Sequence, residues 1–266
     1  MDWIFKAVVT AVMVLIVMRL VGRAGQRLAG VVAALPTITA PTLAWLVHER
    51  GVTFAVDAAV GSVSACAMLA IFALAYALAS RRVGNVASLL CGLVGALAMA
   101  FPAFVASSGL IVALTLALGC STLALASISS RAIPTGNPCQ RSRRSLACVA
   151  IATGSLTALA ATVGPMLGGF ATGLLSSLPL VTGAIAMMEH ATVGPGAAEQ
   201  FLHGYVWGLF GKAAFGAVFA LLAIILGAPL AMAVACGVAG LISVARIPCR
   251  NPELSAPENH SLTRPE

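Results

Sequence analysis

Charge is scarce in this chain of 266 residues. Only 9% of the residues are Asp, Glu, Lys or Arg, and eight are acidic, whereas soluble domains carry roughly 25% charged residues. Hydrophobic residues make up 60% of the chain. This composition excludes an ordinary soluble domain and predicts an all-α polytopic membrane protein. No segment between the ends has the composition of a separate soluble domain.

The usual signatures of enzymes and metal sites are missing too. No CxxC pair occurs among the seven cysteines, so we expect neither a zinc site nor a disulfide framework. The GxSxG, HExxH and Walker motifs are absent. Because the acidic residues are also few and scattered, we expect no enzyme and no cofactor, and a membrane-embedded transferase is the least favoured alternative. The net charge of +7 lies in short connections without interleaved aromatics, which does not suit nucleic-acid binding.

Long apolar runs are abundant instead. A bilayer core of about 30 Å needs about 20 apolar residues per helix, which divides the chain into about nine spans. The first run has no small-residue cleavage site before its arginines, so we expect a retained helix rather than a signal peptide. The predicted spans are Ile4–Val21, Ala29–Val47, Val56–Ala79, Val86–Val105, Gly109–Ile128, Ser145–Val163, Gly168–Met188, Phe201–Leu226 and Pro229–Val244.

The arginines predict the orientation, because Lys and Arg are enriched in cytoplasmic connections. Arginines follow the first, third, fifth and ninth spans. The N-terminus is therefore expected outside and the C-terminus in the cytoplasm, in a bacterial inner membrane whose lipids surround the protein. The connection after the seventh span has no Lys or Arg and is the exception to this pattern.

Two similar segments predict an internal duplication. "GVVAALPTITAP" begins at Gly30 and "GLLSSLPLVTGA" begins at Gly173, 143 positions later. The same offset relates further Gly, Pro and Thr residues, including Pro36 with Pro179 and Thr39 with Thr182. Each copy holds four spans, and one extra span between them makes the second copy inverted. The predicted parts are a first repeat (1–106), a connecting helix and basic cytoplasmic loop (107–144), a second repeat (145–247) and a disordered cytoplasmic tail (248–266).

The first copy resembles the small four-span GlpM membrane proteins, which include YdgC. The matching motifs are "FKA" at Phe5, "LAG" at Leu28, "LPT" at Leu35 and "ERG" at Glu49, over about residues 4–105. The second copy has "MEHATVG" in place of "ERG". The family is linked to alginate or polysaccharide production, so the resemblance implies an architecture more firmly than a reaction.

The paired prolines predict a binding site in the middle of the membrane. Pro36 and Pro179 lie midway along the second and seventh spans, and proline interrupts a helix because it has no N–H and clashes one turn back. Corresponding broken helices in inverted repeats mark transporter sites. The alternative is that both prolines only kink packed helices. The hydroxyl groups expected near the two breaks belong to Thr37, Thr39, Thr42, Ser176, Ser177 and Thr182.

Lys212 lies near the centre of the eighth predicted span. A cation inside the membrane is costly unless it is paired or hydrated. We expect it to balance the charge of an anionic substrate or to form a switchable ion pair. A structural lysine that is paired in the bundle or extends to the interface is the alternative.

Other ionisable residues lie at span ends. Asp57 and Glu199 start the third and eighth spans, either as headgroup-facing residues or, for Glu199 with His203 one turn on, as a proton path. His48 and Glu49 end one broken helix. Glu189 and His190 end the other broken helix. For both pairs the alternatives are gating or proton coupling, simple helix-end polarity, and metal binding, although the spacing fits no known metal cluster.

Together these features predict a secondary transporter or flippase for a small or lipid-linked anion. The alternative is a non-catalytic membrane subunit of a machine for polysaccharide synthesis or export, and either kind of protein is compatible with a homodimer. Water around Pro36, Pro179 and Lys212 is expected for a transporter, and a dry, closely packed centre for the subunit.

Overall fold

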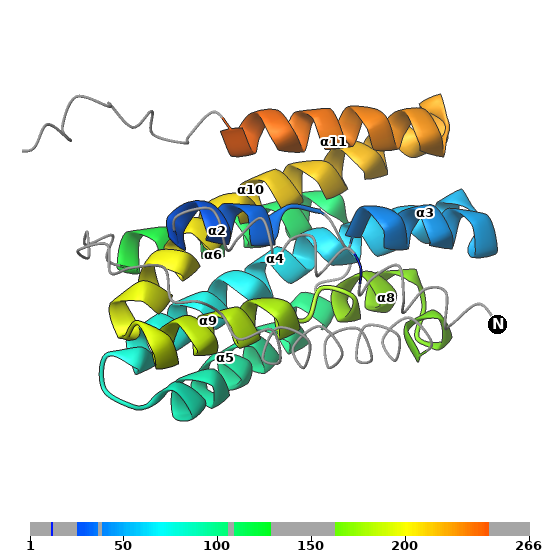
Figure 1. Ribbon diagram of the computed structural model, residues 1–266. Coiled ribbons are helices and arrows are strands. Elements are labelled where there is room, and N and C mark those ends of the chain that lie inside the picture. The colour runs from blue at the N-terminus through cyan, green and yellow to red at the C-terminus, as the bar shows by residue number, and fades with distance from the viewer. Residues whose placement is uncertain (1–11, 13–25, 37–38, 106–108, 129–162, 245–266) are drawn as a thin grey trace, which may run out of the picture.

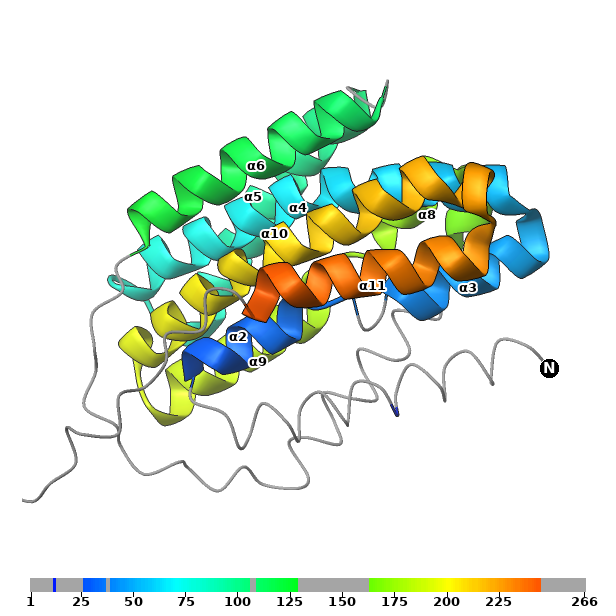
Figure 2. The same ribbon diagram turned by 90° about the horizontal axis from the view of Figure 1, so that it is seen from above.

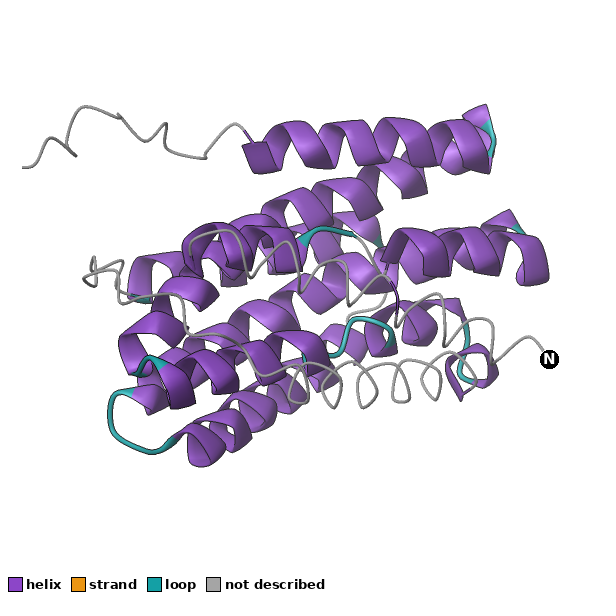
Figure 3. Cartoon of the chain, in the orientation of Figure 1, coloured by secondary structure: helices purple, strands orange, loops and turns teal. Residues whose placement is uncertain are grey.

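All regular elements in the described parts of the chain are helices (Figure 3). The computed structural model describes residues 12, 26–36, 39–105, 109–128 and 163–244. Most of the first and sixth predicted spans, the basic loop after the fifth and the predicted tail lie outside these ranges. The helices are α2 (Gln26–Ala34), α3 (Thr39–Arg50), α4 (Val52–Ser80), α5 (Asn85–Val105), α6 (Leu110–Ser127), η1 (Gly164–Met166), α8 (Gly169–Leu175), α9 (Leu180–Thr192), α10 (Pro195–Leu226) and α11 (Ala228–Val244).

The described helices are long and apolar enough for a membrane protein. Six candidate spans occur, and two of them, Arg27–Arg50 and Gly169–Thr192, are the interrupted pairs α2–α3 and α8–α9. Helix α11 is shorter, with 17 residues. The outer helices expose large apolar side chains, among them Leu97, Phe101, Ile111 and Leu241, and the end of α10 exposes Ile225. Such exposed apolar surface is costly in water, so the helices suggest a membrane-embedded protein.

The two longest helices begin earlier than the apolar pattern predicts. Helix α4 starts at Val52 and α10 at Pro195. Gly51 and Gly194 precede them with φ values of 87° and 120°, a backbone region that favours glycine, and proline suits the first helical position. The polar residues expected to start these spans lie inside the helices, more than one turn along: Asp57 and Glu199.

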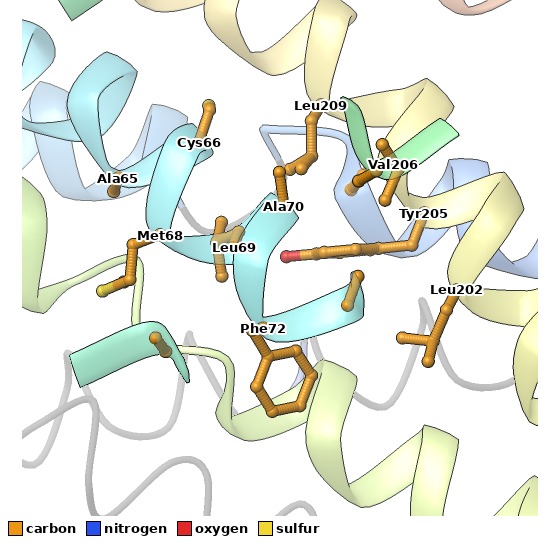
Figure 4. Close-up of a cluster of buried hydrophobic side chains, with 14 of the residues drawn as sticks. Ala65, Cys66, Met68, Leu69, Ala70, Phe72, Leu202, Tyr205, Val206 and Leu209 are labelled. Atoms are coloured by element: carbon orange, nitrogen blue, oxygen red, sulfur yellow. The ribbon is translucent and has the colours of Figure 1, made fainter. Parts of the chain in front are cut away.

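Helices α4 and α10 form an antiparallel central pair (Figures 1 and 2). Gly216 of α10 lies against Ala59 and Val63 in the first half of α4, whereas Glu199, near the start of α10, bonds Arg81 just beyond the end of α4. Figure 2 shows α6 on one side of this pair and α2, α3 and α11 on the other. Figure 4 shows the core where the pair meets, with these residues: Cys66, Met68, Leu69, Phe72, Leu202, Tyr205, Val206 and Leu209.

The short helix before each break packs on the long helix from the other half of the chain. Helix α2 contacts α10, where Gly30 faces the Phe201 carbonyl, and α8 contacts α4, where Gly173 faces the Ala58 carbonyl. Ala58 and Phe201 are themselves 143 positions apart. A second pair of contacts repeats at the same offset, Gly61 with the Phe170 carbonyl and Gly204 with the Arg27 carbonyl.

These contacts predict that Gly173→Ala destabilises the protein. Its Cβ would overlap the Ala58 carbonyl oxygen, and overpacking of this kind costs about 1–3 kcal/mol. We expect a lower Tm in detergent by scanning fluorimetry. Gly119→Ala in α6 is the matched control, because a Cβ there has no neighbour within 4 Å and alanine favours the helix by about 1 kcal/mol. Equal losses in both variants would contradict the close approach of α8 to α4.

Candidate functional site

Both helix interruptions lie where the prolines predict them (Figure 3). Helix α2 ends at Ala34 and α3 begins at Thr39, whereas α8 ends at Leu175 and α9 begins at Leu180. Each proline carbonyl then accepts the first bond of the next helix, Ala40 N to Pro36 O at 2.9 Å and Gly183 N to Pro179 O at 2.8 Å. Both prolines are buried, which fits the rule that interrupted backbone inside a membrane is covered by protein or lines a cavity.

The hydroxyl groups predicted at the breaks have different surroundings. Ser176 donates to the Gly173 carbonyl of its own helix at 3.0 Å. Ser177 instead contacts Ser62 of α4, with 3.3 Å between the two hydroxyl oxygens. Thr39 is buried, and Thr37 lies outside the described residues. The α8–α9 break is therefore joined to α4 by a direct polar contact.

Thr182 links the same break to the other central helix. It is the third residue of α9 and is buried, and its side chain lies beside the Tyr205 side chain of α10. The Tyr205 ring extends from α10 toward α4 (Figure 4). The hydroxyls beside this break thus contact both members of the central pair.

Lys212 is buried in α10, with 8% of its side chain exposed. In the part of the chain that the structure describes, it forms neither a hydrogen bond nor an ion pair. Its electrostatic neighbour is Cys66 of α4. The Cys66 thiol lies 3.5 Å from the Ser62 carbonyl oxygen, and the Ser62 hydroxyl contacts Ser177 at the α8–α9 break. Polar groups of α4 therefore lie between Lys212 and this break.

A second polar group lies where α4 ends and α10 begins. The Arg81 guanidinium donates two bonds to the Glu199 carboxylate, at 2.9 and 3.1 Å. The Tyr76 hydroxyl lies 3.4 Å from Nδ1 of His190. Glu199 therefore forms an ion pair with Arg81, a partner that the sequence did not suggest. The sequence placed only His203 near it, one helical turn along.

His203 and Glu189 are buried near this end of the bundle. Nδ1 of His203 is a fully enclosed atom without a hydrogen-bond partner among the described residues, and the nearby charge is Arg27 of α2. Arg27, Arg81 and Arg82 mark this end as basic. We call it the basic end, comprising Arg27, Tyr76, Arg81, Arg82, Glu189, His190, Glu199 and His203.

The predicted gating residues do not form a single site. His48 and Glu49 are exposed at the end of α3, where the Trp45 indole donates to Glu49 and Arg50 stacks over Phe54 near the start of α4. His190 instead contacts Tyr76 near the end of α4. Because α4 is 29 residues long, these groups lie at opposite ends of the bundle. Asp57 is exposed and lies with the α3 group, beside Gly169.

The end opposite the basic end is closed by apolar side chains. We call this the apolar end, and its buried cluster includes Leu43, Leu46, Ala59, Phe215, Phe219 and Ala223. The basic end of the central pair therefore holds the Arg81–Glu199 ion pair. At the apolar end a buried apolar cluster is accompanied by the exposed residues His48, Glu49, Arg50 and Asp57.

Comparisons of the chain with family models, with curated proteins and with solved structures found no match. The resemblance to GlpM proteins therefore stays a prediction. Sequence reasoning missed several residues that contact the predicted ones: Ser62, Cys66, Tyr76, Arg81 and Tyr205.

Proposed function

We propose that the protein is a secondary transporter or flippase for a small or lipid-linked anion. The observation that carries the proposal is Lys212, a buried lysine side chain that has no ion-pair partner among the described residues. Such a residue inside a membrane bundle is by default a functional-site hypothesis. The substrate anion supplies the charge that balances the lysine.

The substrate-binding groups come from the α8–α9 break and the central pair. Ser62 presents its hydroxyl from α4 and Ser177 from the break. Thr182 of α9 and Tyr205 of α10 present two further hydroxyls. Hydroxyl donors bind oxygen anions and discriminate little between carboxylate and phosphate. The N-terminus of α9 adds a favourable dipole for negative charge.

Inverted repeats provide the second line of support. Gly30 of α2 contacts α10, and Gly173 of α8, 143 positions later, makes the corresponding contact with α4. The glycine-bearing short helix comes from the first half in one contact and from the second half in the other. A two-fold axis in the membrane plane relates such halves in transporters built from inverted repeats. In this proposal α6, which contacts both α4 and α10, is the connecting helix between a first unit that contains α2–α5 and a second that contains α8–α11.

The two ends of the central pair supply gates of different chemistry. Opening the basic end requires the Arg81–Glu199 pair to separate or to move as a unit. Opening the apolar end requires Phe215 and Phe219 to leave Leu43 and Leu46. Alternating access exposes the Lys212 site through one end at a time.

The basic end is assigned to the cytoplasm of a bacterial inner membrane, because Arg27, Arg81 and Arg82 gather there. Single cysteines at Arg82 and Met166, in a protein whose native cysteines are replaced, are expected to label from opposite sides. Position 82 follows α4, whereas Met166 precedes the helix that lies against the start of α4. A membrane-impermeant maleimide on inside-out and right-side-out vesicles measures this. Labelling of both positions from one side contradicts the inverted arrangement.

The function is tested by flux in proteoliposomes. Labelled small carboxylates test the transport of free anions, and a dithionite assay with fluorescent phosphatidylglycerol tests lipid flipping. Either activity, above that of protein-free liposomes, supports the proposal. The alternative, an accessory subunit of a polysaccharide machine, is supported by the dense glycine packing of the short helices, and it predicts no flux in either assay.

A further inference from the structure

We propose that Lys212 is a neutral amine in the empty site and takes up one proton together with one monovalent anion. The inference rests on the proposed transport function and specifies its substrate class and coupling ion. One anion and one proton then cross the membrane together, so that transport is electrically neutral.

Lys212 lies too far along α10 for its amine to reach either end of the helix. The nearer end of α10, Leu226, is 14 residues away, about 21 Å along the helix axis. This is far beyond the reach of a four-carbon side chain. Neighbouring helices also approach α10 on both sides of the lysine, with Ala34 against Gly208 and Val63 against Gly216.

The described helices that pack on α10 bring no carboxylate to Lys212. On α4 the facing titratable group is the Cys66 thiol, and Asp57 and Arg81 lie toward the two ends of that helix. On α10 itself the nearest titratable neighbour along the described chain is the Tyr205 phenol, seven residues earlier, and the nearest residue that can carry a positive charge is His203, nine residues earlier and about 14 Å along the axis. Glu199 is bonded to Arg81.

The remaining neighbours are equally poor in charge. Helix α2 contributes Arg27, which lies near His203, and α9 contributes Glu189 and His190 near Tyr76 at the basic end. Helices α6 and α11 contain no Asp, Glu, Lys, Arg or His within their described bounds, only the thiols of Cys120 and Cys236.

An unpaired ammonium in such surroundings is less stable than the neutral amine. Burial disfavours the charged form of lysine, and an isolated buried charge costs several kcal/mol. The amine is therefore the resting form of the empty site. When an anion binds, its negative charge favours the ammonium, so the amine lone pair takes up one proton from the bulk buffer.

One ammonium neutralises one negative charge, which selects a monovalent anion. The balance is amine plus proton plus anion giving an ammonium–anion pair, with no other bond made or broken. A divalent anion would leave one uncompensated charge in the site. Carboxylates and phosphodiesters share the required chemistry, the first as small free anions and the second as lipid headgroups.

The experiment measures proton uptake on binding by titration calorimetry of the purified full chain in detergent. Titrations at pH 8 use two buffers of different ionisation enthalpy, and the probes are acetate, benzoate, dihexanoyl phosphatidylglycerol and sulfate. We expect uptake of about one proton per bound monovalent anion and no binding of sulfate. The probe that binds distinguishes a free carboxylate from a lipid phosphodiester as the source.

Lys212→Arg provides the matched variant, because arginine stays charged in proteins. It should bind the same anion without proton uptake. In proteoliposomes it should retain anion exchange but lose net uptake at least tenfold, since the empty charged site cannot cross. Electroneutral flux in the native protein, unchanged by a valinomycin-imposed potential, tests the same point without a variant.

The outcomes separate this inference from the proposed function. Anion binding without proton uptake, or electrogenic flux, overturns the coupling while transport stands. Net uptake by Lys212→Arg at the native rate also overturns it. Absence of binding and of flux for every probe overturns both the proposed function and the inference.

Discussion

Lys212→Met is expected to abolish anion transport and to leave the fold intact. Methionine keeps the length of the side chain and removes the charge that balances the substrate. Leaving one member of a buried charge pair without its partner costs about 3–5 kcal/mol, so transport should fall at least a hundredfold. The measurement is flux in proteoliposomes at equal protein density, with the anion that the native protein transports.

Leu69→Met is the matched control for this substitution. Leu69 occupies the position 143 residues before Lys212 and is also buried, in α4. A change from leucine to methionine conserves volume and usually costs less than about 1.5 kcal/mol. Native flux is expected in this control. Full activity of Lys212→Met at normal protein levels contradicts a role for the lysine in transport.

The stability of Lys212→Met gives an independent readout. Replacing a buried polar group that lacks a hydrogen-bond partner by an apolar residue of similar volume removes the cost of burying that group. We therefore expect an unchanged or raised Tm together with lost transport. A residue retained for packing alone predicts the reverse, a lowered Tm, because its removal would disturb the close contacts of α10 with α2 and α4.

The architecture could be predicted from the sequence where its causes are local. Pro36 and Pro179 lie at the two interruptions, where the missing N–H of proline and its clash one turn back disfavour a continuous helix. Long apolar runs predicted most helices of the described chain. The fixed offset of Gly30 and Gly173 predicted a duplication, and in the structure both glycines make equivalent close backbone contacts. The starts of α4 and α10 were missed, because polarity sets apparent span ends whereas backbone geometry at Gly51 and Gly194 sets the real ones.

The partners within the candidate site could not be predicted, because they depend on tertiary packing. Arg81 and Glu199 are 118 positions apart, and Ser62 and Ser177 are 115 apart. Their contacts require α4 and α10 to run antiparallel and α8 to pack on α4 rather than within its own half. Neither hydropathy nor spacing carries this information. The same packing separated His48 and Glu49 from Glu189 and His190, although all four end interrupted helices.

Each short helix packs on the long helix of the other half of the chain, and this packing decides which contacts must change in the proposed transport cycle. The α8–α9 break belongs to the second unit, yet Ser177 contacts Ser62 of the first. If one unit rocks against the other around the site, this contact lies across the moving boundary. By contrast, Gly95 of α5 lies against Ala75 of α4 within the first unit, where a Cβ at 95 would be 3.0 Å from the Ala75 Cβ. A covalent link at each position distinguishes rocking from a static bundle.

Ser62→Cys with Ser177→Cys is expected to stop transport when the two thiols are oxidised. Their native hydroxyl oxygens are 3.3 Å apart, close enough for a disulfide. Cys66 is replaced by alanine in all variants, because its thiol lies beside Ser62. Oxidation with copper phenanthroline should reduce flux at least tenfold relative to the same reduced protein, and dithiothreitol should restore it. Ala75→Cys with Gly95→Cys is the matched pair within one unit, and its oxidation should leave flux unchanged. Undiminished flux through the fully oxidised Ser62–Ser177 pair contradicts movement of the α8–α9 break against α4, because a closed disulfide holds the two together in both states of the cycle.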